Sequence, residues 1–169
     1  MEKKNIAALV AIVGIVVAVM VSGCADKQLG LGGAPSINNP EDVVKAYHYY
    51  IFSKWDYKTA YELSVDPSTL EPYSEEKINL YTPKETLPSG WKMTYELEIL
   101  EKRELNKDER WYYTAMGIPE ETKMYKITYL FTVATTTNEE TFEEQSEEEM
   151  LVIQTNEGWR LLGLGGLGI

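Results

Sequence analysis

The spacing of hydrophobic residues changes once along this chain. Between residues 43 and 55 the apolar positions recur every three to four residues, as on one face of an α-helix. The segment Asn39-Pro40-Glu41-Asp42 is typical of a helix start, because Asn caps, Pro suits the first position and acidic residues face the positive end of the helix dipole. We therefore predict one helix over residues 40–54. Its apolar arc holds Val43, Val44, Ala46, Tyr47, Tyr50, Ile51 and Trp55.

From residue 91 the spacing changes to two. Residues 92–99 and 125–133 alternate apolar and polar side chains, which is typical of strands with one buried and one wet face. We expect a third strand over residues 142–154, and Asn156-Glu157-Gly158 predicts a hairpin into a last strand at 159–162. The residues expected in the core are Tyr47, Ile51, Leu97, Ile127, Tyr129, Phe131, Val152, Trp159 and Leu161.

Helices followed by antiparallel strands predict an α+β domain. Between them, Asp56 is expected to cap a short helix at 57–63, and Ser74 to open another that ends at Tyr81. Trp111-Tyr112-Tyr113 does not alternate cleanly, so these rings are either core residues or part of an exposed loop that contacts a partner. Asn138-Glu139-Glu140 predicts a turn.

The first 24 residues have the layout of a secretory signal. Lys3 and Lys4 precede a run of 16 apolar or small residues, which ends in Val21-Ser22-Gly23-Cys24. This last segment resembles the lipobox of prokaryotic lipoproteins, in which the cysteine receives a diacylglyceryl group and becomes the first mature residue. The resemblance implies lipid on Cys24 and a domain held at the cell membrane, outside the cytoplasm. The alternative is an uncleaved anchor helix, although 16 residues span only about 24 Å of a core of about 30 Å.

This layout divides the chain into a signal at 1–23, a tether at 24–39, a domain at 40–163 and a tail at 164–169. The Gly-rich tether has a reach of roughly 20 Å, which clears the lipid headgroups. Gly163 to Gly168 spells a phosphate-binding glycine pattern, but no helix follows it to supply backbone N–H groups. We expect a flexible tail there.

The domain resembles the NTF2-like (cystatin-like) family, over about residues 38–163. The resemblance rests on the Asn-Pro helix start, on Asp56-Tyr57-Lys58-Thr59-Ala60-Tyr61-Glu62-Leu63, and on the terminal Gly158-Trp159-Arg160-Leu161. It implies a curved antiparallel sheet that wraps a long N-terminal helix to form a cone.

The charge and the scarcity of certain residues exclude several classes of function. The net charge is −11, and removing residues 1–23, with two lysines and one glutamate, makes it −12. Such a surface repels nucleic acids and anionic headgroups, so we exclude nucleic-acid binding. With one histidine and one cysteine, the chain is not expected to hold a metal or cofactor. Seven of the eleven residues at 139–149 are Glu, which predicts a solvated hairpin that keeps a sheet edge from pairing.

The remaining candidates point to binding. His48 lies at the rim of the apolar arc, and Trp55 and Tyr95 are expected with it on the inner side of the cone. Together with Trp111 and Tyr112 they are our candidate pocket or partner-contact residues. We expect a lipoprotein that presents a domain for an envelope protein or a small apolar ligand. The alternatives are a structural envelope protein without a small ligand, and a lyase- or isomerase-like cone enzyme. No catalytic residue is assigned.

Overall fold

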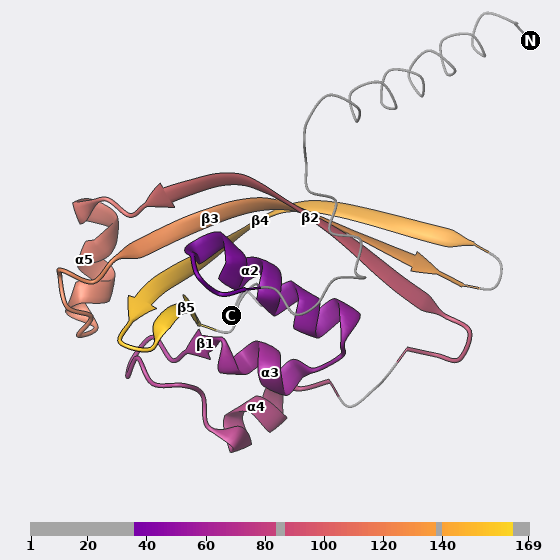
Figure 1. Cartoon of the computed structure of the whole chain (residues 1–169), viewed down its shortest axis with the longest axis horizontal. Coiled ribbons are helices and arrows are strands. Elements are labelled where there is room, and N and C mark those ends of the chain that lie inside the picture. The colour runs from indigo at the N-terminus through magenta and orange to yellow at the C-terminus, as the bar shows by residue number, and fades with distance from the viewer. Residues whose placement is uncertain (1–35, 84–86, 138–139, 164–169) are drawn as a thin grey trace, which may run out of the picture.

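The computed structural model describes residues 36–83, 87–137 and 140–163. The helices near the N-terminus lie on one side of a curved sheet, and a helix from the middle of the chain lies at one end of that sheet (Figure 1). Cys24, most of the predicted tether, the tail at 164–169 and two residues of the predicted turn at 138–140 lie outside the described residues. Within the described ranges, no helix is both long and apolar enough to span a membrane.

The N-terminal helix begins where the sequence predicts. Helix α2 (Pro40–His48) is capped by Asn39, whose side-chain oxygen accepts a hydrogen bond of 2.9 Å from the Asp42 N–H. Helical structure continues to Ser53, close to the predicted end at residue 54, but residues Tyr49–Ser53 form a π-helix, η1, and not the α-helix that the spacing predicts. The chain then turns sharply at Trp55, which has the left-handed φ of 56°. The aromatic side chains of η1 are therefore placed differently from those of an α-helix.

The two short helices that follow confirm their predicted caps. Helix α3 (Tyr57–Glu62) is capped by Asp56, whose carboxylate accepts the Thr59 N–H at 3.0 Å. Helix α4 (Glu75–Tyr81) is capped by Ser74.

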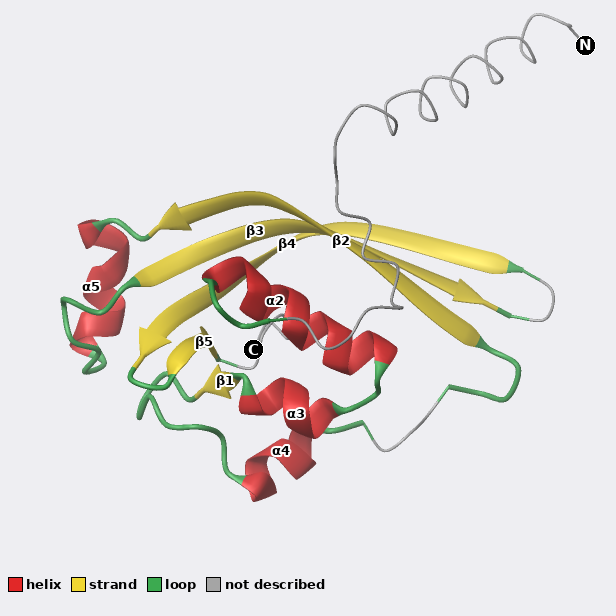
Figure 2. Ribbon diagram, in the orientation of Figure 1, coloured by secondary structure: helices red, strands yellow, loops and turns green. Residues whose placement is uncertain are grey.

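The sheet has five strands in the order β1-β5-β4-β3-β2. The long strands β2 (Lys92–Glu104), β3 (Met124–Thr136) and β4 (Thr141–Thr155), with β5 (Gly158–Leu162), pair antiparallel as the alternation predicts. The two-residue strand β1 (Ser64–Val65) pairs parallel with β5 and was not predicted, because two residues show no periodicity. The fold is α+β, with N-terminal helices packed on a mostly antiparallel sheet (Figure 2).

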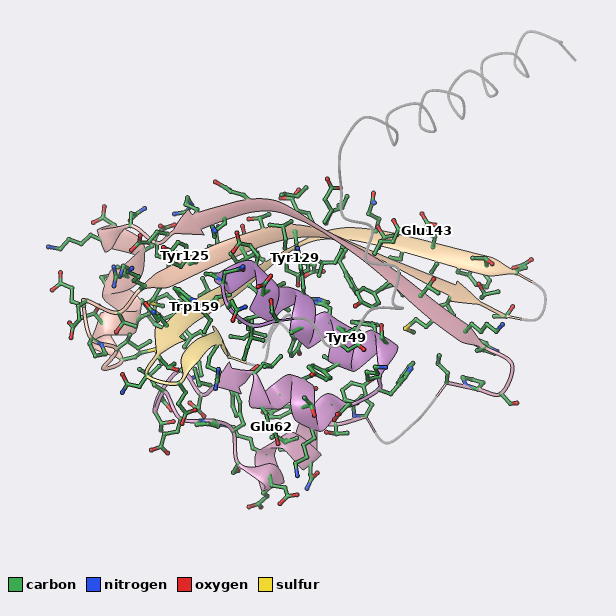
Figure 3. All side chains as sticks on the ribbon, viewed as in Figure 1. Tyr49, Glu62, Tyr125, Tyr129, Glu143 and Trp159 are labelled. Atoms are coloured by element: carbon green, nitrogen blue, oxygen red, sulfur yellow. The ribbon has the colours of Figure 1, made fainter. Side chains whose placement is uncertain are left out.

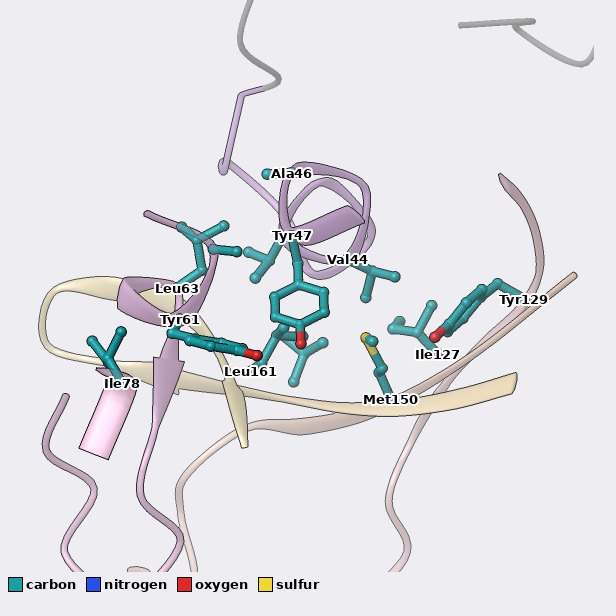
Figure 4. Close-up of a cluster of buried hydrophobic side chains, with 13 residues drawn as sticks. Val44, Ala46, Tyr47, Tyr61, Leu63, Ile78, Ile127, Tyr129, Met150 and Leu161 are labelled. Carbon is teal, nitrogen blue, oxygen red and sulfur yellow. The ribbon is translucent and has the colours of Figure 1, made fainter. Parts of the chain in front are cut away.

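The main core lies between the helices and one face of the sheet, which we call the inner face (Figure 4). Tyr129 and Ile127 project from β3 onto this face, and Tyr61 reaches it from α3. Of the predicted core residues, Tyr47, Ile127, Tyr129, Val152 and Leu161 are buried. Ile51, Leu97, Phe131 and Trp159 are half-buried and pack against the same cluster.

A smaller core covers one end of the opposite, outer face. Met124 and Ile153 are register partners on that face, and they pack with Leu105 and Ile118. Helix α5 (Lys107–Ala115) covers this end of the sheet and contributes Tyr113 to the cluster. The loop considered for residues 111–113 is therefore wrong: these residues belong to a helix whose side chains bond to residues up to 12 positions away, as Glu109 does to Arg103 and Arg110 to the Thr122 carbonyl.

Candidate functional site

His48 is a core residue and does not lie at the rim of the helix. Its side chain is 4% exposed, and its Nδ1 donates a hydrogen bond of 2.9 Å to the Val44 carbonyl. Burial lowers the pKa of His48 to about 4, because the imidazolium would lose its hydration. The side chain is therefore neutral at pH 7.

The rings around His48 form what we call the aromatic cluster. His48 stacks on Phe52 of η1 at 6.0 Å between centroids, and meets Tyr129 at 5.0 Å and Phe131 at 4.8 Å from β3. Tyr95 of β2 joins through Phe52, at 5.6 Å. Because these rings contact one another, they fill the space between η1 and the inner face of β2 and β3.

Tyr95 and Trp55 lie at the edge of this cluster. Tyr95 is half-buried, and its hydroxyl is hydrogen-bonded to Ser53; burial nevertheless raises the pKa of Tyr95. Trp55 is 38% exposed, and its ring packs against the Tyr57 ring with 6.4 Å between the two centroids. The structure thus brings His48 and Tyr95 into one cluster and leaves Trp55 beside it on the surface.

Trp111 and Tyr112 lie elsewhere. Both belong to α5 and are among the most exposed large apolar side chains, at 67% and 53%. Helix α5 lies at the end of the sheet opposite to the free ends of β3 and β4 (Figure 1). The five candidate residues therefore form two separate groups, one around η1 and one on α5.

The sequence analysis missed a third surface, at the free end of the three long strands. We call residues 92–99, 129–136 and 141–148 the distal arm; its strands start from the main core at Tyr129 and run out past the ends of the described helices (Figure 2). Its register places Met93, Thr135 and Phe142 in one row across the inner face. Phe142 is 58% exposed, and Trp91, just before β2, is 43% exposed. This surface was not predicted, because the many glutamates around Phe142 predict a hairpin that is solvated on both faces.

Carboxylates share the inner face of the distal arm with these apolar groups. Glu144 pairs with Val133, and Glu148 pairs with the buried Tyr129, so both project from the same side of β4 as Phe142. The Glu148 carboxylate accepts a hydrogen bond of 2.9 Å from the Ser146 hydroxyl. Burial, and secondarily the negative charge of Glu148, raises the pKa of Tyr129.

The burial and the hydrogen bonds of these groups limit the chemistry that they can supply. Across the described ranges, no cluster of His, Cys, Asp and Glu could hold a metal ion. A histidine with a pKa of about 4 is a weak base, and its hydrogen bond goes to a backbone carbonyl. The exposed aromatic rings and the carboxylates of the distal arm are suited to contact with another molecule.

Comparison of the chain with protein-family models, with curated proteins and with solved structures finds no match.

Proposed function

We propose that this chain is a lipoprotein, anchored to the cell membrane through Cys24, whose domain at 40–163 binds a partner outside the cytoplasm. The observation that carries the proposal is Val21-Ser22-Gly23-Cys24 at the end of a 16-residue apolar run. Two lipid chains on one cysteine give stable attachment, where a single chain is marginal.

We also propose that the domain at 40–163 is NTF2-like, and the order of its elements supports this. Capped helices precede long antiparallel strands, and α2 packs on the inner face of a curved sheet (Figure 1). This is the order that the family resemblance implies. The parallel β1 and the helix α5 between β2 and β3 are additions to that plan in this chain.

The packing favours a macromolecular partner over a small ligand inside the cone. The rings of the aromatic cluster occupy the space next to η1, while Trp111 and Phe142 lie in the open at the two ends of the sheet. Exposed aromatic side chains of this kind are enriched at protein interfaces. The same filled interior makes a structural envelope protein the second candidate.

Detergent partitioning of a Cys24→Ala variant tests the anchor. In a prokaryotic host that processes lipoproteins, the wild-type chain should enter the detergent phase as a mature form that begins at Cys24. Cys24→Ala should remain an unprocessed precursor without added lipid. Ser22→Ala, which keeps a small residue next to the cleavage site, is the control and should behave as wild type. Equal processing of wild type and Cys24→Ala would exclude the lipoprotein.

A further inference from the structure

We infer that the inner face of the distal arm docks an amphipathic, basic helix of a partner protein. The inference rests on the proposed function, since it names the chemistry of the partner that the domain would bind.

An apolar column and an acidic column lie side by side on this face. The register puts Tyr95, Val133 and Glu144 in one row, next to the row of Met93, Thr135 and Phe142. Apolar side chains therefore come from β2 and β3, and carboxylates come from β4. Figure 3 shows Tyr129 on the helix side of the sheet and Glu143, the outward-facing neighbour of Glu144, farther along the arm.

The carboxylates on this face stand where a buried strand would have apolar residues. Met150 and Val152 of β4 face the same side and are buried in the core, and the alternation continues through Glu148 and Glu144. Covering a carboxylate with apolar groups alone is costly, because the charge loses its hydration. An occupant must therefore bring positive charge to Glu144 and Glu148 and apolar groups to Val133 and Phe142.

The overall charge agrees with a basic partner. The mature chain carries about twelve excess negative charges, counted from the net −11 less the one net positive charge of residues 1–23. An acidic partner would be repelled, and a basic one would be attracted at long range.

The dimensions of the face fit one helix. From Phe142 to Glu148 the strand β4 extends about 20 Å. A helix of about 13 residues has this length, and its diameter is about 10 Å. The aromatic cluster covers this face of the sheet at Tyr95 and Phe131, so its open part lies along β4. Such a helix would lie along β4 beside η1, with an apolar stripe over Val133 and Phe142 and with Lys or Arg side chains over Glu144 and Glu148.

A peptide titration with face-matched variants tests the inference. The full chain in phosphatidylcholine nanodiscs is titrated with a fluorescein-labelled 14-residue helical peptide that has a Leu stripe flanked by Lys; empty nanodiscs give the background. The double variant Glu144→Gln/Glu148→Gln changes the inner face. Glu143→Gln/Glu147→Gln changes the net charge equally on the outer face of the same strand, so it controls for overall charge.

The inner-face pair should weaken binding about tenfold, and the outer-face pair less than about twofold. Phe142→Ser should also weaken binding, with circular dichroism confirming that each variant is folded. Equal losses for the two pairs, no loss for the inner pair, or equal binding of a peptide with Glu in place of Lys would overturn the inference.

The outcomes separate this inference from the anchor. The titration does not depend on lipid at Cys24, because nanodiscs of the Cys24→Ala chain, held by the signal run, can be measured in the same way. Preference for the inner face without lipid on Cys24 would keep the docking surface and remove the lipoprotein. Lipid on Cys24 without that preference would do the reverse.

Discussion

At the scale of single residues, His48 differs most from what the sequence predicts. The helical spacing places it at the rim of an apolar arc, but the structure surrounds it with Phe52, Tyr129 and Phe131. Its burial depends on the π-helix and on strands about 80 residues away in the sequence. A helical-wheel projection of residues 40–54 includes neither the π-helix nor the sheet, so the burial of His48 could not be predicted. The caps at Asn39, Asp56 and Ser74 could be predicted, because each side chain accepts a hydrogen bond from the N–H only three residues later.

The buried histidine predicts a specific loss of stability in acid. The pKa of His48 is about 4 in the folded chain and about 6.5 when unfolded. The contribution of neutral His48 to the free energy of unfolding is complete above pH 6.5. It falls as the pH drops towards 4, because between these two pH values only the unfolded state takes up the proton. The free energy of unfolding should decrease by about 3 kcal/mol over this range from His48 alone.

Urea unfolding between pH 7 and pH 4 measures this effect in the wild type and in His48→Gln. Carboxylates titrate in both proteins, so the difference between the two curves isolates the histidine. The variant should show the shallower dependence on pH. Parallel curves would mean that His48 is not the acid-sensitive group.

At the scale of elements, two-residue alternation predicts β2 and β3, because each strand has one face against a core and one face in water. The turn at Asn156-Glu157-Gly158 predicts the hairpin from β4 into the short β5. Helix α5 was missed because its apolar residues Trp111, Tyr112 and Tyr113 are consecutive and show no helical spacing. The signal that could have found it is Asn106 followed three residues later by Glu109. The structure shows this pair as a capping box, with the two side chains bonded to each other's backbone N–H groups.

The capping box predicts that α5 depends on Asn106. Replacing Asn106 by Ala removes the oxygen that accepts the Asp108 and Glu109 N–H groups, and should lower the free energy of unfolding by about 1 kcal/mol. Asn79→Ala, at an exposed position within α4, is the control and should have a smaller effect. Urea denaturation measures both. An unchanged midpoint for Asn106→Ala would show that contacts such as that of Tyr113 hold α5 without its cap.

At the scale of the whole molecule, the domain exposes aromatic side chains at both ends of one sheet. Trp111 and Tyr112 lie on α5, and Phe142 lies on the distal arm. The sequence predicts the acidic character of the β3–β4 hairpin, but it does not show that Glu144 and Glu148 share a face with Phe142. That depends on the register of β4 against β3. A shift of one residue would move these carboxylates to the outer face and bring Glu143 and Glu147 inward.

We propose that lipid on Cys24 holds this domain at the membrane. Intact mass spectrometry of the native protein, purified from its own membranes, tests it most directly. We predict a chain of residues 24–169 with the mass of a lipid group on Cys24 and with a basic partner that dissociates in high salt. A chain with unmodified Cys24, or one that begins at another residue without lipid, would contradict the account.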